Sequence, residues 1–233
     1  MADAPTDFLN VIEDIQKNVF GTLNKVSTTL SELDTNQLSI VARELDFLQE
    51  LDRQGYNKAL NDLMKKYDDE VVNVFREARA RGVETSVASV RSLELLKELD
   101  TTTLLGKAQE FSTTLKSELL KGIIAGESSE IITERLQRTV TTLTTAQTRL
   151  VVNDSFARFS NSAKFKAFED LPETRYKYVG PLDGKTRDAC VKVLNNPQNA
   201  EGFTTAEING LDGVGQADRG GFNCRHEWEV VLW

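Results

Sequence analysis

The sequence predicts a mainly α-helical protein, an elongated bundle of about six helices with a small α+β cassette at its C-terminus. The chain has 233 residues but only 4 prolines and 14 glycines, and eight of those glycines lie after residue 179. The first 179 residues are therefore almost free of helix breakers. In that part apolar residues recur at spacings of three and four, the period of a helix face. We expect two domains, a helical body over residues 1–172 and the cassette over residues 173–233.

The first four expected helices each show an apolar stripe. The first, over residues 8–33, has a narrow stripe that cannot bury itself, so it must pair with another helix of the chain or of a partner. The second covers residues 38–51, with Gly55 as the residue after its end. The third covers residues 56–82, and arginines in its last turns complement the helix dipole. The fourth covers residues 85–99.

Polar clusters mark the boundaries of the last two long helices. The cluster at residues 100–103, Asp-Thr-Thr-Thr, is expected to end the fourth helix and to cap a fifth over residues 104–123. A turn at residues 126–129, with a serine hydroxyl as the N-cap, then starts a sixth helix, which is expected to run to Phe168. Residues 139–145 of that helix are rich in threonine and form helix poorly in isolation, but the periodicity on both sides favours a helix.

The cassette is expected to be a mixed α+β unit. Residues 174–179 alternate and are rich in β-formers, which predicts a strand that could pair with a closing strand at residues 226–233. Residues 185–194 predict one short helix. Thr204 and Glu207 have the spacing of a capping box, which predicts a further helical turn.

Composition excludes several classes of protein. No run of about eighteen apolar residues exists, so we expect no membrane-spanning segment and no membrane partner. The first residues lack the basic and apolar regions of a secretion signal. Two cysteines are too few for a disulfide framework and indicate synthesis in a reducing cytoplasm.

The net charge of −8 is unevenly distributed. Residues 1–70 carry 14 Asp and Glu against 7 Lys and Arg, whereas residues 135–187 carry 10 Lys and Arg against 5 Asp and Glu. This balance argues against DNA as the main ligand. The basic segment leaves two interpretations, a solvated helix face or a weak contact with double-stranded DNA.

Both cysteines and the only histidine lie in two short blocks near the C-terminus. The first block is DGKTRDAC at residues 183–190, and the second is GGFNCRH at residues 220–226. A helical segment with an arginine and an asparagine, AQTRLVVN at residues 146–153, precedes them. This order resembles the Mu F-like minor head proteins of tailed bacteriophages, also called phage head morphogenesis proteins. The resemblance covers roughly residues 117–233, and the two blocks are specific only in combination.

The resemblance implies a structural protein of the virion head rather than an enzyme. Its expected partners are the portal protein, the major capsid protein, or both, and it could form a homo-oligomer in the virion. The implied role is in head assembly, DNA packaging or DNA ejection, with packaged double-stranded DNA as a weak further contact. The protein would be found in the virion head, and in the host cytoplasm during assembly.

Cys190, Cys224 and His226 are ligand types that zinc takes, so a structural zinc ion is one interpretation of the two blocks. The family pattern has a further histidine before the second block and ends that block with cysteine. This chain has glycine at the first of those places and His226 at the second. Asp183 could supply a fourth ligand. The other interpretations are a Cys190–Cys224 contact, reduced or oxidised, and a buried His226 that bonds a backbone carbonyl.

Charged residues of the blocks are interpreted as structural polar ties that hold the glycine-rich loop. Asp183 and Arg187 are spaced i, i+4 and are expected to face each other at a helix N-terminus. Arg225 could pair with Asp183 or with Asp188.

Two other functional classes stay open. One is an enzyme, a nuclease or transferase, in which Arg225 and His226 act on nucleic acid or nucleotide. The other is a coiled-coil scaffolding or adaptor protein that binds its partner through residues 1–170.

Overall fold

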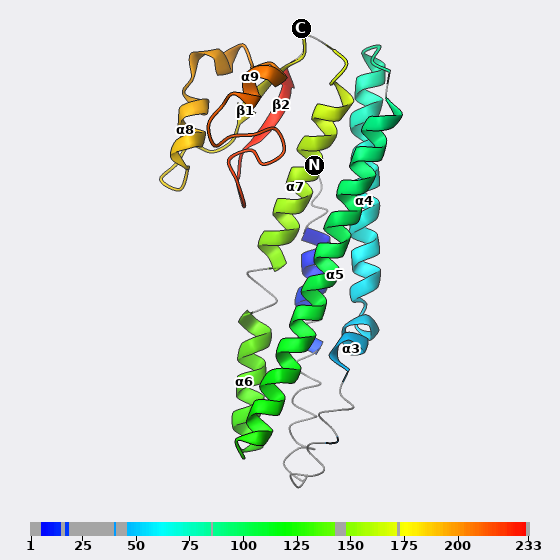
Figure 1. The fold of residues 1–233 in the computed structure, drawn as a ribbon, viewed down its shortest axis with the longest axis vertical. Helices are drawn as coiled ribbons and strands as arrows, with labels where there is room; N and C mark the ends of the chain where they lie inside the picture. The colour runs from blue at the N-terminus through cyan, green and yellow to red at the C-terminus, as the bar shows by residue number, and fades with distance from the viewer. Residues whose placement is uncertain are drawn as a thin grey trace. The chain divides into compact units, whose positions relative to one another are not determined.

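The computed structural model describes residues 6–14, 17–18, 40, 46–84, 86–142, 148–171 and 173–231. These residues are mainly helical, with a two-stranded antiparallel sheet near the C-terminus (Figure 1), so the predicted fold class is confirmed. The elements in chain order are α3 (Phe47–Arg53), α4 (Tyr56–Ala80), α5 (Val87–Ile124), α6 (Ser129–Thr142), α7 (Thr148–Ala167), β1 (Arg175–Val179), α8 (Asp188–Leu194), the 3-10 helix η2 (Pro197–Ala200), α9 (Thr205–Asn209) and β2 (Glu227–Val231). Residues 6–14 are also helical, whereas the rest of the first predicted helix and most of the second lie outside the described residues.

The contacts of the chain define two compact units. Unit 1 comprises residues 1–64 and 101–150, and unit 2 comprises residues 65–100 and 151–233. Both α4 and α5 contribute residues to each unit. The predicted division into a helical body over residues 1–172 and a cassette over residues 173–233 stays a prediction.

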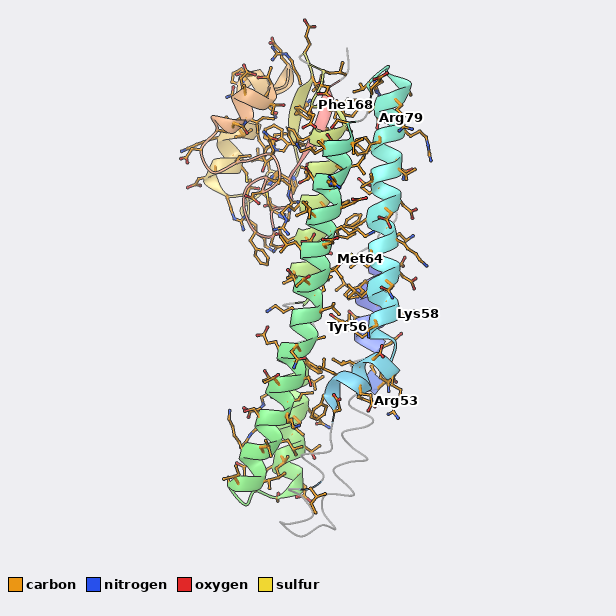
Figure 2. The ribbon with its side chains drawn as sticks, turned by 45° about the vertical axis from the view of Figure 1, so that its right-hand side comes forward. Arg53, Tyr56, Lys58, Met64, Arg79 and Phe168 are labelled. Atoms are coloured by element: carbon orange, nitrogen blue, oxygen red, sulfur yellow. The ribbon has the colours of Figure 1, made fainter. Side chains whose placement is uncertain are left out.

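Unit 1 joins the start of α4 to the second part of α5. Tyr56, labelled in Figure 2, is buried and donates a hydrogen bond from its hydroxyl to the carbonyl oxygen of Leu104 at 2.8 Å. Its ring also makes an edge contact with Phe8. Asp46 caps α3 by accepting hydrogen bonds from two backbone amides. Gly126 has a φ of +68°, which places the predicted turn between α5 and α6.

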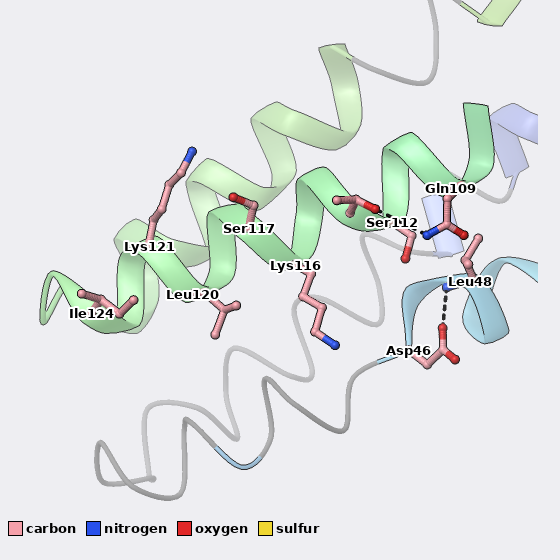
Figure 3. Close-up of a pocket in the computed structure, with 10 residues that line it drawn as sticks. Asp46, Leu48, Gln109, Ser112, Lys116, Ser117, Leu120, Lys121 and Ile124 are labelled. Atoms are coloured by element: carbon pink, nitrogen blue, oxygen red, sulfur yellow. Dashed lines mark hydrogen bonds between the residues drawn. The ribbon is translucent and has the colours of Figure 1, made fainter. Parts of the chain in front are cut away.

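A hollow on unit 1 lies between the start of α3 and the second part of α5 (Figure 3). Its walls present hydroxyl, amide, carboxylate, ammonium and alkyl groups, and none of the residues singled out from the sequence is among them. The lining residues are Asp46, Leu48, Gln109, Ser112, Thr113, Lys116, Ser117, Leu120, Lys121 and Ile124.

The predicted helix break at residues 100–103 is wrong, because α5 continues through them from Val87 to Ile124. Asp100 is fully buried in unit 2, where its carboxylate accepts hydrogen bonds from Arg158 at 2.6 Å and from the Tyr67 hydroxyl at 3.3 Å. Because Arg158 and Tyr67 satisfy the Asp100 carboxylate, this side chain is not available to cap a helix end. The cluster therefore stays inside one long helix.

Where the sequence predicts one sixth helix, the structure has two, α6 and α7. Residues 143–147, the end of the threonine-rich stretch, lie outside the described residues. Among the described helices, none has the length and apolar character needed to cross a lipid bilayer.

The cassette closes through the predicted pairing of its two strands. Strands β1 and β2 are antiparallel, with Arg175 opposite Val231 and Val179 opposite Glu227. The capping box is present, since Thr204 and Glu207 bond each other's backbone at the start of α9. Helix α8 begins three residues later than predicted. The short helix η2 follows it.

Helix α7 forms one wall of the cassette within unit 2. The amide of Asn161 accepts a hydrogen bond from the Trp228 backbone N–H at 2.9 Å, and Lys164 donates to Glu227 at 2.9 Å. Phe165 stacks on the ring of Tyr176 and meets Trp228 edge-on. Strand β2 is thus held by hydrogen bonds and aromatic packing to a helix that precedes it in sequence.

Candidate metal centre

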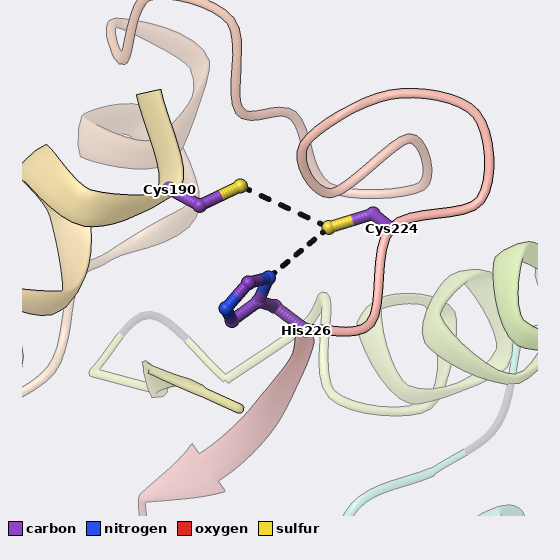
Figure 4. Close-up of side chains that lie close together, drawn as sticks. All are labelled: Cys190, Cys224 and His226. Atoms are coloured by element: carbon purple, nitrogen blue, oxygen red, sulfur yellow. Dashed lines mark hydrogen bonds between the residues drawn. The ribbon is translucent and has the colours of Figure 1, made fainter. Parts of the chain in front are cut away.

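The structure brings Cys190, Cys224 and His226 into one cluster (Figure 4). The two sulfurs are 3.9 Å apart, and the Cys224 sulfur lies 3.4 Å from Nδ1 of His226. One ligand atom from each residue lies within 4.8 Å of the others, and all three side chains are buried. Cys190 comes from α8, whereas Cys224 and His226 precede β2. The two sequence blocks therefore meet through the fold of the cassette.

Arg187 joins the two blocks through backbone carbonyls. It is the residue before α8, and its guanidinium donates at 2.6 Å to the carbonyl oxygens of both Gly220 and Phe222. The predicted role of Arg187 in holding the glycine-rich loop is consistent with these contacts. The predicted Asp183–Arg187 pair is wrong, because the Arg187 guanidinium is directed to the loop carbonyls instead.

Gly220 lies directly against the thiols. A Cβ at this position would lie 3.0 Å from the Cys224 sulfur, closer still to the Cys190 sulfur, and 3.2 Å from the Tyr178 hydroxyl. Only a residue without a side chain fits here. The loop backbone therefore covers the cluster at van der Waals distance on this side.

The ring of His226 is held by a hydrogen bond at each nitrogen. Its Nε2 lies 2.8 Å from the carbonyl oxygen of Pro181, which can only accept. In the neutral ring Nε2 therefore carries the proton, and the lone pair of Nδ1 is directed toward Cys224. This arrangement, with one nitrogen donating to a carbonyl and the other directing its lone pair to the cluster, is the usual one for a metal-bound histidine. It also agrees with the interpretation of a buried His226 that bonds a carbonyl.

Tyr178 is a member of the cluster that the sequence did not reveal. It is 1% exposed, and its hydroxyl lies 3.4 Å from the Cys190 sulfur and 3.5 Å from the Cys224 sulfur. Its ring stacks on that of His226, with centroids 5.3 Å apart. The alternation of β1 was a signal for its inward position, since Tyr176 and Tyr178 share one face of the strand. That pattern could not show which groups the hydroxyl meets.

The two thiols differ in electrostatic environment. Burial raises the pKa of the Cys190 thiol. Burial also acts to raise the pKa of the Cys224 thiol, but hydrogen bonds from the Tyr178 hydroxyl and from the backbone N–H of His226 outweigh it and lower that pKa to about 7. Cys224 is therefore the thiol that ionises first, which suits it to bind a cation.

Asp183 does not belong to this cluster. Its exposed carboxylate makes a bidentate pair with the guanidinium of Arg225, at 2.8 and 2.6 Å, and also accepts a hydrogen bond from the Lys185 backbone N–H. These donors hold the pKa of Asp183 well below its usual range. The prediction of Asp183 as a fourth metal ligand is therefore replaced by its other predicted role, a polar tie with Arg225.

The three cluster residues fit a zinc site in chemistry, and two of their three separations have the spacing of a tetrahedron. With zinc–sulfur bonds of about 2.3 Å and zinc–nitrogen bonds of about 2.0 Å, a tetrahedron has sulfur–sulfur edges of about 3.8 Å and sulfur–nitrogen edges of about 3.5 Å. The observed Cys190–Cys224 and Cys224–His226 separations are 3.9 and 3.4 Å. The sulfurs are free thiols, too far apart for a disulfide. The site therefore has the spacing of a metal centre more than that of a crosslink.

Comparisons with protein-family models, with curated proteins and with solved structures find no match to this chain.

Proposed function

We propose that the protein is a structural minor head protein of a tailed bacteriophage, located in the virion head and bound to the portal or to the inner capsid. Its role would be in head assembly, DNA packaging or DNA ejection. One observation carries the proposal: the two blocks behind the resemblance, residues 183–190 and 220–226, fold against each other around the two thiols and the imidazole. A chance match of two short motifs would give no reason for them to meet.

The cassette would be held together by one structural zinc ion. Its core is small, and small modules of this kind commonly need a metal or a disulfide for stability. Cys190, Cys224 and His226 would hold the ion, which would crosslink α8 to the segment before β2. Elemental analysis of the purified protein should find about one zinc per chain, lost in Cys224→Ser.

The helical part would provide the contact with the head. Leu95 and Leu99 lie one turn apart on α5 and are 63% and 57% exposed, so this stretch presents apolar surface that a partner could cover. The basic residues within 135–187 could contact packaged DNA.

Sedimentation of head particles tests the proposed function. An antibody against this chain should detect it in purified virions and in heads that contain portal, at a constant ratio to the portal protein. Recovery of the chain only in the fraction without particles would contradict the virion role. Recovery from heads assembled without portal would contradict the portal contact alone, and would favour the inner capsid as the binding site.

The geometry does not favour the catalytic alternative at Arg225 and His226. His226 is 3% exposed and both of its ring nitrogens are engaged, whereas Arg225 is paired with Asp183. A general acid or base needs a nitrogen within reach of substrate. The adaptor alternative is tested by truncation, since a chain ending at residue 170 should then keep its partner.

A further inference from the structure

The cluster has three ligands of the types zinc prefers, but a closed structural site has four. We propose that the side-chain oxygen of Tyr178 is the fourth ligand of the zinc ion held by Cys190, Cys224 and His226. This inference rests on the proposed zinc binding and deepens it, because it assigns the corner of the tetrahedron that the sequence left to Asp183.

The position of the Tyr178 oxygen carries the argument. It lies 3.4 Å from the Cys190 sulfur and 3.5 Å from the Cys224 sulfur. With a zinc–oxygen bond of about 2.0 Å, the expected sulfur–oxygen edge of a zinc tetrahedron is about 3.5 Å. The oxygen thus stands at the same distance from both sulfurs as a ligand would. The other three ligand atoms all lie within 4.8 Å of one another.

The backbone of Tyr178 is fixed by a side chain from η2. Asn199 accepts a hydrogen bond from the Tyr178 N–H at 2.8 Å and donates one to the Tyr178 carbonyl at 2.9 Å. Asn199 is itself 6% exposed. These two hydrogen bonds hold the backbone of Tyr178 in place, and a metal ligand needs such support to keep its geometry.

Competing ligands have little room at the site. Gly220 packs so closely that even a methyl group would overlap the sulfurs, and Tyr178, Cys190 and His226 are each no more than 3% exposed. Asp183 is held outside by Arg225. A solvent molecule would have to displace the phenol oxygen to reach the same corner. Tyr178 therefore occupies the place that water takes in open, three-ligand zinc sites.

Zinc binding would release three protons, one from each thiol and one from the phenol. The zinc–sulfur bonds form as each thiol loses its proton to solvent, and the zinc–oxygen bond forms as the phenol loses its own. His226 binds as the neutral ring through Nδ1 and keeps its proton on Nε2, donated to Pro181. A bound phenolate has a distinct near-ultraviolet absorption, whereas a phenol that merely donates a hydrogen bond to sulfur does not.

The test is a titration of the reduced, metal-free protein with zinc ions, followed by near-ultraviolet difference absorption. The wild type should gain the band of one tyrosinate per chain, saturating with one zinc. Tyr178→Phe should lose the band and bind zinc about 100-fold more weakly, at least as large a loss as that of an outer-shell partner. Tyr176→Phe is the matched control, since this residue is buried on the same face of β1 and its hydroxyl makes no hydrogen bond to either sulfur. It should keep both the band and the affinity.

Two outcomes would overturn the proposal in different ways. If the wild type binds one zinc without a tyrosinate band, and Tyr178→Phe binds as tightly, Tyr178 is not a ligand while the three-residue site stands. If the wild type binds no zinc, both the ion and its fourth ligand are refuted. Neither result depends on the virion role, which the sedimentation of head particles tests separately.

Discussion

The carboxylate of Asp154 on α7 lies 3.0 Å from the guanidinium of Arg219, and the two side chains are only 14% and 4% exposed. The same carboxylate oxygen accepts the backbone N–H of Asn223 at 2.7 Å. Arg219 donates in turn to the carbonyl oxygen of Cys224 at 3.0 Å. Arg219 and Asn223 both have a φ of +57°, a conformation that non-glycine residues rarely adopt. One helix residue thus holds a strained loop that positions a candidate zinc ligand.

Asp154→Ala should strongly destabilise unit 2. The substitution leaves the buried Arg219 guanidinium without its counter-charge, which typically costs about 3–5 kcal/mol. Urea unfolding measures the change in free energy. Asp170→Ala, which removes an exposed acid just after α7, is the control and should stay within about 0.5 kcal/mol of wild type. Equal losses in the two variants would show that Asp154 does not hold the loop.

Gly220→Ala should destabilise the cassette and separate the thiols. The added methyl group would overlap the two sulfurs, and overpacking of this kind costs about 1–3 kcal/mol. Thermal unfolding and the zinc affinity report the two effects. Gly184→Ala is the matched control, because a Cβ there meets nothing within 4 Å. A wild-type zinc affinity in Gly220→Ala would mean that the loop does not cover the site as described.

Arg158→Leu should destabilise unit 2, and the deficit should shrink as the pH falls. Burial raises the pKa of Asp100 even beside Arg158, and loss of the arginine raises it further. A carboxyl with a raised folded-state pKa destabilises the folded protein above that pKa, because there it is buried in its charged form. Below its unfolded-state pKa it is protonated in both states and has no such effect. We expect a loss of about 3–5 kcal/mol at neutral pH.

Unfolding free energies at neutral and at acidic pH measure the effect of Arg158→Leu. Arg79→Leu, at an exposed arginine in the last turn of α4 (Figure 2), is the control. It should cost at most about 1 kcal/mol, with little change over the same pH range. A pH-independent deficit in Arg158→Leu would count against a buried charge at Asp100.

Alkaline pH should weaken unit 1 through Tyr56. Burial raises the pKa of Tyr56 from 10.0 to about 12. Its contribution is therefore complete below pH 10 and is lost as the pH rises to about 12, to a total of about 2–3 kcal/mol. Tyr56→Phe should flatten this part of the pH–stability curve, while losing the hydrogen bond to Leu104 at every pH. An unchanged alkaline slope in Tyr56→Phe would refute the assignment.

Features set by neighbouring residues could be predicted from the sequence. The capping box at Thr204 and Glu207 depends on two residues three positions apart, and the turns at Gly55 and Gly126 require a positive φ that glycine adopts freely. The pairing of β1 with β2 was also predicted, because only two β-rich segments were available to each other in the cassette.

Features set by distant partners could not be predicted. Asp100 has the sequence context of a helix cap, and only its contacts with Tyr67 and Arg158, 33 and 58 residues away, explain why α5 continues. Asp183 reads equally well as a metal ligand or as a partner of Arg225, 42 residues away. Asp154 carries no local motif at all. In each case the deciding energy comes from a contact that the fold must first create.

The separation of the two strands in sequence has a consequence for synthesis. Strand β1 ends at Val179 and its partner begins at Glu227, so at about 5–20 residues per second the ribosome needs about 2 to 10 seconds to deliver the second strand. During that interval the nascent chain carries an unpaired strand and, for much of it, the thiol of Cys190. Aggregation through the unpaired strand, or oxidation of the Cys190 thiol, would therefore occur during this interval, before the cassette closes around its cysteines.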